Sequence, residues 1–432
     1  MPSENVVLEG HIIDSLVLPK VLDEIVEHNA SFEIVDLNIG TKNEDASFAL
    51  ITVTAESDEA LSALIDRLQQ HGANPEAVED ATLIEADIDG SFPPGFYSTT
   101  NLDTEIRVKG KWLPIRHPEM DCGIVYEGGI ARTLPMGDVR AGMQIVVRGL
   151  GIRVTPPAKP RDAEERQAFE FMSSDISSEK PKALLVEQVA AQMREVKERG
   201  KRILWVAGPA VIHTGSGPDL CALIRAGYVD AFFAGNGVAA HDIESNMFGT
   251  SLGVSLEQGV PAEHGHEHHI RAINELRRHG SFQGAIEAGV FGDGVVYHLV
   301  TSGADYIFGG SVRDDGPLPE VVTDMAEVQR RLRAIIWGQD GEDLVGYCIV
   351  VGTMLHGIAT GNCLPASVPL VCVDINQATV TKLMDRGSFQ SMGIITDVGL
   401  FIRELAEALA PDETRPAGED ATARRAGSRT RR

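Results

Sequence analysis

The sequence lacks long apolar runs and any segment typical of a secretion signal. None of its 432 residues lies in a run of about 18 apolar residues, the length that a membrane helix needs. The first residues, Met1 to Asn5, place no basic group ahead of an apolar stretch. We therefore expect a cytoplasmic protein that neither enters a membrane nor is secreted. Its length allows two or three domains.

Cysteine is scarce. The five cysteines are scattered, odd in number and never in a C-x-x-C pair: Cys122, Cys221, Cys348, Cys363 and Cys372. This pattern excludes a disulfide framework and gives no local support for a thiolate zinc site.

Basic residues are also few, 38 Lys and Arg against 63 Asp and Glu, which leaves a formal charge of −25. Binding to nucleic acids or to anionic membrane surfaces needs patches of positive charge. We therefore expect neither partner. The acidity suits a small cationic substrate, or only favours solubility.

Residues 1–100 alternate the patterns of strands and helices. The strand patterns are Asn5 to Ile13, Phe32 to Ile39 and Ser47 to Ala55, and the helical patterns are Leu18 to His28 and Leu61 to Leu68. This order predicts a ferredoxin-like α+β module, which more often serves regulation or assembly than chemistry.

The remaining chain divides into three parts. Residues 101–160 carry short β patterns broken by Gly and Pro, which predicts a small β-rich subdomain. Residues 161–410 are predicted to form an α/β domain, and residues 411–432 lack apolar periodicity and are expected to be disordered.

The α/β domain contains a series of short, continuously apolar strands. After a helix at Leu184 to Arg199 they are predicted at Arg202 to Ala207, Ala231 to Ala234, Tyr306 to Gly309, Tyr347 to Val351 and Leu370 to Val373. Such strands, separated by helical segments, indicate a parallel sheet covered on both faces. Ligands of these sheets bind beyond the carboxyl ends of the strands.

Five of these strands run directly into Gly, Asn, Asp or Thr. The segments are Gly208-Pro209, Gly235-Asn236-Gly237, Gly309-Gly310-Ser311, Gly352-Thr353-Met354 and Asp374-Ile375-Asn376. Each alone is an ordinary turn, but together they favour a dinucleotide crevice, because glycine lets a ligand approach the backbone. The usual G-x-G-x-x-G fingerprint is missing, since Leu220 follows Gly215 and Gly217 where a third glycine is expected.

Several ionisable residues are candidates for chemistry. Asp374 and Asp397 could bind a ribose diol or a substrate ammonium, although Asp397 could simply cap the following helix. Lys382 could carry a proton, or be a solvated helix lysine. In the loop Arg116 to Cys122, Glu119 and Asp121 could bind a diamino acid, whereas Cys122 has no paired histidine for nucleophilic catalysis.

A histidine run, Glu263 to His269, invites a metal hypothesis. It does not match H-E-x-x-H, and a turn leading into a helix from Ile270 to Arg278 explains it better. We expect no metal.

With these segments the sequence resembles the LOR/SDH-domain family, which includes archaeal ornithine cyclodeaminases and the C-terminal part of cyanobacterial arginine dihydrolase/ornithine cyclodeaminases. The resemblance covers most of the chain beyond Leu102. Its stretches are Pro118 to Cys122, Ser177 to Pro181, Ala234 to Glu244, Gly309 to Pro319, Gly352 to Pro365 and, the most specific, Val373 to Gly399.

The resemblance implies a Rossmann-like NAD-binding sheet similar to that of deoxyhypusine synthase. The implied cofactor contacts are Asn236, Gly237, Asp314, Thr353, Met354, Leu355, His356, Asp374, Asp397 and Val398. The implied activity converts L-ornithine to L-proline and ammonia by oxidation at NAD, ring closure, ammonia loss and re-reduction. The guanidine-modifying domain of the cyanobacterial proteins has no counterpart here, so we expect no arginine dihydrolase activity.

For this reaction, Asp374, Lys382 and Asp121 are the candidate catalytic residues, and Glu119, Asp121 and Asn376 the candidate substrate contacts. We expect a homo-oligomer. Two alternatives stay open: an NAD(P)-dependent dehydrogenase of amino acids such as saccharopine, and a non-catalytic amino-acid sensor that uses the ferredoxin-like module.

Overall fold

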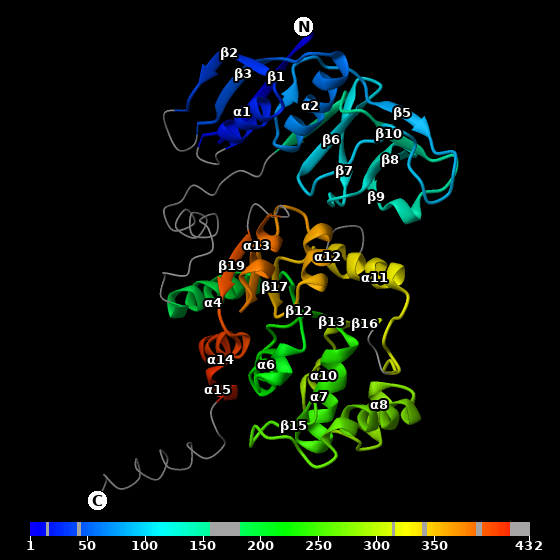
Figure 1. Ribbon diagram of the computed structural model, residues 1–432, viewed down its shortest axis with the longest axis vertical. Helices are drawn as coiled ribbons and strands as arrows, with labels where there is room; N and C mark the ends of the chain where they lie inside the picture. Colours follow the sequence, from blue (N-terminus) through cyan, green and yellow to red (C-terminus); the bar gives the residue numbers. More distant parts are fainter. Residues whose placement is uncertain are drawn as a thin grey trace, which may run out of the picture. The chain divides into compact units, whose positions relative to one another are not determined.

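The structure is a computed structural model that describes residues 1–13, 17–40, 45–155, 182–312, 316–338, 344–385 and 391–414. The chain forms two compact units (Figure 1). The first comprises Met1–Ser174, Thr360–Pro369 and Met384–Met392, and the second Asp175–Ala359, Leu370–Leu383 and Gly393–Arg432.

The first unit begins with the predicted ferredoxin-like module. Its elements are β1 (Ser3–Gly10), α1 (Val17–Glu27), β2 (Ser31–Asn38), β3 (Ser47–Thr54), α2 (Asp58–Gln70) and β4 (Asn74–Pro75). The antiparallel sheet has the order β2-β3-β1-β4. Alternate residues of β3, among them Ala49, Ile51 and Val53, are buried in one core with the apolar residues of both helices.

A seven-stranded sheet follows in the same unit. Its strands are β5 (Thr82–Glu85), β6 (Asp103–Val108), β7 (Lys111–Arg116), β8 (Gly123–Glu127), β9 (Ile130–Leu134), β10 (Gln144–Val147) and β11 (Ile152–Thr155), in the order β11-β6-β7-β9-β8-β10-β5. The short helix η1 (Met136–Asp138) joins β9 to β10.

Residues 76–100 belong with this second sheet. Strand β5 pairs with β10, and the side chains of Phe92 and Tyr97 are buried in the cores beneath the sheet. We therefore propose that the ferredoxin-like module ends near Pro75, whereas the sequence suggested residue 100. The expected start of the α/β domain, residue 161, lies outside the described residues.

The second unit is built on a six-stranded sheet with the order β16-β13-β12-β17-β18-β19. The strands are β12 (Ile203–Ala207), β13 (Ala231–Gly235), β16 (Asp305–Gly309), β17 (Tyr347–Val351), β18 (Leu370–Asp374) and β19 (Ser391–Ile395). The pairs from β16 to β18 are parallel. Every residue of β12 and β17 is buried, which explains their continuous apolar sequence.

Helices cover both faces of this sheet (Figure 1). On one face lie α4 (Lys182–Glu198), α14 (Val398–Leu409), α6 (Gly217–Arg225) and α10 (Val295–Ser302), each packed against the next. On the other face lie α11 (Met325–Trp337), α12 (Leu355–Cys363) and α13 (Gln377–Asp385). The predicted parallel sheet with two helical layers is confirmed.

A long excursion separates β13 from β16. It contains α7 (Asn236–Phe248), β14 (Thr250–Ser251), β15 (Val254–Ser255), η2 (Gly265–Glu267), α8 (His268–His279), α9 (Phe282–Glu287) and α10. The short helices α5 (Ala210–His213) and α15 (Pro411–Thr414) complete the unit. Among the described residues, no helix is both long and apolar enough to cross a membrane.

In chain order the strands run 3-2-1-4-5-6 across the sheet. This is the order of the doubly wound nucleotide-binding fold, in which ligands bind where the strand order reverses. Here the reversal lies between β12 and β17.

Candidate functional site

A cavity of about 450 Å³ opens at the carboxyl ends of the strands next to this reversal. Segments after β12, β13, β16 and β17 contribute to it, together with side chains from α5, α7 and α8. The lining residues are Ala207, Gly208, Pro209, His213, Gly235, Asn236, Gly237, Ala240, His241, Leu252, His269, Ile273, Ser311, Thr353 and His356. We call this cavity the strand-end pocket.

Glycine is required where β12 and β17 end. A Cβ atom on Gly208 would lie 1.9 Å from the carbonyl oxygen of Gly352, and Gly352 itself has a φ of +61°. Side chains are therefore excluded at the reversal point, because the two strand ends pack backbone to backbone there, and Gly208 also lines the strand-end pocket. We call these two strand ends the cradle. This cradle fits the pyrophosphate of a dinucleotide.

The implied cofactor residues of the first four strand ends surround this cradle. Asn236 is buried and its Oδ1 accepts a hydrogen bond from the Leu318 N–H at 3.1 Å, while Gly237 lies in the first turn of α7. Thr353 and His356 line the strand-end pocket, with Oγ1 and Nδ1 3.4 Å apart. The exposed residues Met354 and Leu355 lie at the start of α12. Asp314 lies outside the described residues.

Asn376 and Asp397 cap the helices after β18 and β19, and Asp374 ends β18. The Asp374 carboxylate accepts the Asn376 N–H at 2.7 Å, and the Asn376 side chain accepts the Ala378 N–H at 3.0 Å. Asp397 caps α14, since its Oδ1 accepts the Leu400 N–H at 2.9 Å. Buried Val398 begins that helix.

Lys382 is exposed on α13, and neither Lys382 nor Asp374 lines the strand-end pocket. A carboxylate that accepts one such hydrogen bond can still accept others, so the cofactor roles of half-buried Asp374 and exposed Asp397 stay predictions, as do the catalytic roles of Asp374 and Lys382.

In the first unit, the loop before β8 holds Glu119 and Asp121. Glu119 is 3% exposed, and its Oε2 lies 3.9 Å from the Cys122 sulfur. Asp121 has a left-handed φ of +61°, and its Oδ2 accepts a hydrogen bond from the Asn362 amide at 3.1 Å. The structure therefore places both carboxylates in one loop, where burial and hydrogen bonds restrict them. Their role in substrate binding stays a prediction.

Four residues of the second unit form a cluster that the sequence analysis missed. Three imidazoles, His213, His241 and His269, line the strand-end pocket. Ring centroids are 4.9 Å apart for His213 and His241, and 6.3 Å for His241 and His269. Behind them, Glu244 is fully buried and its Oε2 lies 2.8 Å from Nδ1 of His241.

The Glu244 carboxylate is surrounded by donors. It accepts hydrogen bonds from Thr250 Oγ1 at 2.9 Å, from Gly253 N–H at 2.8 Å and from Leu252 N–H at 3.2 Å. Burial raises its pKa, but the bonds to His241, Gly253 and Thr250 together outweigh burial and lower the pKa. The carboxylate is therefore ionised at neutral pH.

Two imidazoles of the pocket, His213 and His356, favour the neutral form. Burial lowers the pKa of His356, and burial together with nearby His241 lowers that of His213, whose Nδ1 lies 2.7 Å from Ser251 Oγ. A signal for the cluster was present in the sequence, because His241 and Glu244 stand at i and i+3 on the helix after a strand end.

The histidine run near residue 265 does not stay together. His264 and His266 are exposed, His268 stacks on Phe248 at 4.6 Å, and His269 lines the strand-end pocket. Helix α8 begins at His268, so the run forms a turn leading into a helix.

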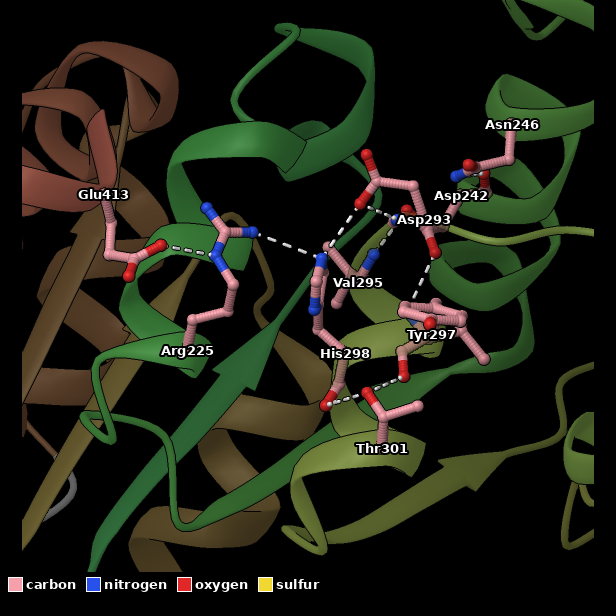
Figure 2. A network of polar contacts seen from close by, with 11 residues as sticks. Arg225, Asp242, Asn246, Asp293, Val295, Tyr297, His298, Thr301 and Glu413 are labelled. Atoms are coloured by element: carbon pink, nitrogen blue, oxygen red, sulfur yellow. Dashed lines mark hydrogen bonds and ion pairs between the residues drawn. The ribbon is translucent and has the colours of Figure 1, made fainter. Parts of the chain in front are cut away.

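A second cavity of the same unit, about 490 Å³, is lined in part by Cys221, Asp242 and Asp293. Asp242 and Asp293 also belong to a different polar network (Figure 2). Cys221, Asp293 and His298 are, among the described residues, the one group whose ligand atoms could meet on a metal ion. However, Nε2 of His298 already lies 2.9 Å from Asp293 Oδ1 and 3.2 Å from the Arg225 guanidinium, which in turn binds Glu413. A metal ion would lie beside this positive charge, so we assign the network to structure.

Comparison with known proteins identifies the family. Residues 187–405 match the model of the ArgZ-like arginine dihydrolase C-terminal Rossmann fold, residues 103–186 the first region of the same C-terminal part, and residues 3–102 the LOR/SDH bifunctional enzyme conserved region. The ornithine cyclodeaminase of Methanothermobacter thermautotrophicus is 45% identical over 93% of this chain and 96% of its own.

Two cyanobacterial structures are similar. The apo structure of ArgZ, an arginine dihydrolase, is 35% identical with a TM-score of 0.81 and covers 96% of this chain. The ternary complex of AgrE with ornithine and NAD⁺ is 39% identical with a TM-score of 0.50 and covers 94%. The present chain spans 59% and 57% of those two proteins. The chain therefore belongs to the ArgZ-like family, together with the archaeal ornithine cyclodeaminases.

Proposed function

We propose that this protein is an NAD-dependent enzyme that converts L-ornithine to L-proline and ammonia. The observation that carries the proposal is the match, over almost the full length of both chains, with an archaeal ornithine cyclodeaminase. The doubly wound sheet with a cradle at its reversal point supports it, because such an enzyme must hold a dinucleotide.

The chain offers a distinct group for each part of the cofactor. The first N–H groups of α12, which follows Gly352, suit the pyrophosphate, and strand-end carboxylates such as Asp374 suit a ribose diol. When bound, NAD supplies an acceptor for a hydride from the substrate α-carbon and returns that hydride after ring closure. The residues around it must orient the substrate and move protons.

Incubation of the purified protein with ornithine tests the proposal, with proline and ammonia measured with and without added NAD. We expect equal amounts of both products and no lasting change in absorbance at 340 nm, because the hydride is returned. Stoichiometric accumulation of NADH would instead identify a net dehydrogenase. Absence of proline would overturn the proposal.

No observation favours the two alternatives. The LOR/SDH region is confined to residues 3–102, which lie outside the nucleotide-binding sheet. A sensor without activity would need neither the cradle nor the histidine cluster.

We further propose a homo-oligomer in the cytoplasm. The five cysteines are buried and none forms a disulfide, which supports a reducing compartment. Support for assembly comes from edge strand β2, where Phe32, Ile34, Val35 and Leu37 are each at least 38% exposed. Light scattering coupled to size-exclusion chromatography measures the oligomeric state directly. A monomeric mass at the protein concentration used for activity measurements would contradict the homo-oligomer.

A further inference from the structure

We propose that His241 is a catalytic residue that transfers protons to and from the substrate amines in the strand-end pocket, and that Glu244 positions it. The inference rests on the proposed function and names where its chemistry takes place. It differs from the sequence-based expectation, which assigned proton transfer to Asp374, Lys382 and Asp121.

The distribution of carboxylates along the sheet edge indicates which end of the cofactor the pocket receives. A doubly wound sheet usually carries a ribose-binding acid after its second strand. Here that position is Asn236, whose side-chain oxygen already accepts the Leu318 N–H. The acid is Asp374 instead, after the fifth strand, on the far side of the reversal point.

With the adenosine ribose at Asp374 and the pyrophosphate at the start of α12, the nicotinamide half extends toward β12 and β13. The strand-end pocket lies at the ends of these strands. Its 450 Å³ is sufficient for a small amino acid beside a nicotinamide ring.

The His241 and Glu244 pair has the geometry of an oriented general base. The buried carboxylate accepts the Nδ1–H of His241 at 2.8 Å, which fixes the tautomer and leaves Nε2 as the basic nitrogen. Glu244 is itself fixed by donors from the segment after α7. An ionised carboxylate behind the imidazole also stabilises the imidazolium that forms during proton transfer.

The rest of the pocket suits this role. Apart from the histidines, no lining residue among those described carries an ionisable side chain. No carboxylate of the described chain therefore lines the pocket to hold the substrate ammonium in its charged form, and burial favours neutral His213 and His356. The amine can therefore lose its proton to His241.

The protons balance within one turnover. Nε2 of His241 takes a proton as an ammonium N–H bond of ornithine breaks, which frees the lone pair needed for α-carbon oxidation or for ring closure. The same nitrogen then gives its proton to the former α-amine, which leaves as ammonia and takes up a proton from water to become ammonium. Ornithine with one net positive charge becomes neutral proline plus one ammonium ion, so no external acid is consumed.

Substitution His241→Ala tests the proposal, with His298→Ala as a matched control. His298 also pairs with a carboxylate, at 2.9 Å from Asp293, and its side chain is 15% exposed against 12% for His241, but it does not line the strand-end pocket (Figure 2). We expect His241→Ala to lower the single-turnover rate of proline formation by about 10²–10⁴, and His298→Ala to change it by less than about threefold.

Two further readouts separate chemistry from folding. NAD affinity, measured by calorimetry, should change by less than about threefold in His241→Ala. Added imidazole should raise the single-turnover rate of this variant at least about tenfold. Imidazole should not raise the rate of His298→Ala. A rate within about threefold of wild type in His241→Ala, or a loss that imidazole does not relieve in a folded protein that binds NAD, would overturn the proposal.

The positioning role of Glu244 is tested by Glu244→Gln alone and together with His241→Ala. The amide keeps an acceptor for Thr250 and Gly253 but loses the charge. We expect a loss of roughly ten- to a hundredfold in the single variant and no additional loss in the double variant, because Glu244 acts through His241. Additive losses would overturn the coupling.

Failure of the two proposals can be distinguished. If the wild-type protein produces no proline, the proposed function is wrong. If wild type produces proline and His241→Ala does so equally well, the function stands and the assignment of His241 is wrong.

Discussion

At the scale of single residues, the structure contains two buried carboxylates on α7 with opposite tendencies. Glu244 is held ionised by its donors, whereas Asp242 has a raised pKa of about 6, because burial outweighs the hydrogen bonds from the Val295 and Val296 N–H groups. The two carboxylates stand two positions apart, so the difference arises from their surroundings.

Asp242 should therefore make stability depend on pH. A carboxyl whose folded pKa is raised from 3.8 to about 6 stabilises the fold below pH 4, and this contribution is lost as the pH rises to about 6. Relative to Asp242→Asn, which does not titrate, wild type should lose up to about 3 kcal/mol of unfolding free energy over this range. Urea titrations of both proteins from pH 4 to pH 7 measure it. If wild type instead gained unfolding free energy relative to Asp242→Asn as the pH rises, the two N–H bonds would have a larger effect on the Asp242 pKa than burial.

Asp374 and Lys382 distinguish the sequence-based placement of the chemistry from the placement at His241. We expect Asp374→Asn to weaken NAD binding by about tenfold while turnover at saturating NAD falls by less than tenfold, and Lys382→Met to change turnover by less than about threefold. Steady-state kinetics with NAD and ornithine varied independently provide both values. A 10²- to 10⁴-fold fall in turnover at saturating NAD for either variant would show that the substituted residue takes part in the reaction.

At the scale of elements, the sequence predicted what local patterns determine. Strands β12 and β17 were evident because a fully buried parallel strand is apolar at every position. Strand β5 was not predicted, since its four residues, Thr82–Glu85, are mostly exposed and are defined by pairing with distant β10.

The histidine cluster was missed for a similar reason. The spacing of His241 and Glu244 is common on solvated helices, and it gains meaning only because the segment after α7 folds back to donate from Thr250 and Gly253. Long-range contacts of this kind leave no periodic trace in the sequence. The strand-end glycines, by contrast, were recognisable, because the chain order placed them at the edge that parallel sheets use for ligands.

The close approach of the ends of β12 and β17 yields a prediction for Gly208. In Gly208→Ala the new methyl group would meet the Gly352 carbonyl, so the two strand ends must separate. We expect NAD affinity to fall at least tenfold and stability by about 1–3 kcal/mol. Gly292→Ala is the control, because a Cβ there meets nothing within 4 Å. Equal NAD affinity in both variants would show that the cradle does not hold the cofactor.

At the scale of the whole molecule, the charge of −25 should act on a cationic substrate at a distance. Salt screens such attraction over about 10 Å at 0.1 M. We expect KM for ornithine to rise several-fold between low and high ionic strength, with turnover at saturation changing much less. Inhibition by proline, which carries no net charge, provides the comparison. If both ligands respond equally to salt, the net charge plays no part in capture.

The excursion between β13 and β16 also bears on how this enzyme could be redesigned. The cofactor cradle, Asp374 and the implied contacts Asn236 and Gly237 belong to strand ends of the sheet, whereas the segment that fixes Glu244 and the pocket residue His269 come from residues 249–294. Cofactor holding and substrate chemistry therefore reside in separable stretches of the gene. Variant libraries with substitutions only at codons 249–294 could be screened for enzymes that cyclise longer or shorter diamino acids. The strand ends that hold the dinucleotide would stay unchanged in every variant.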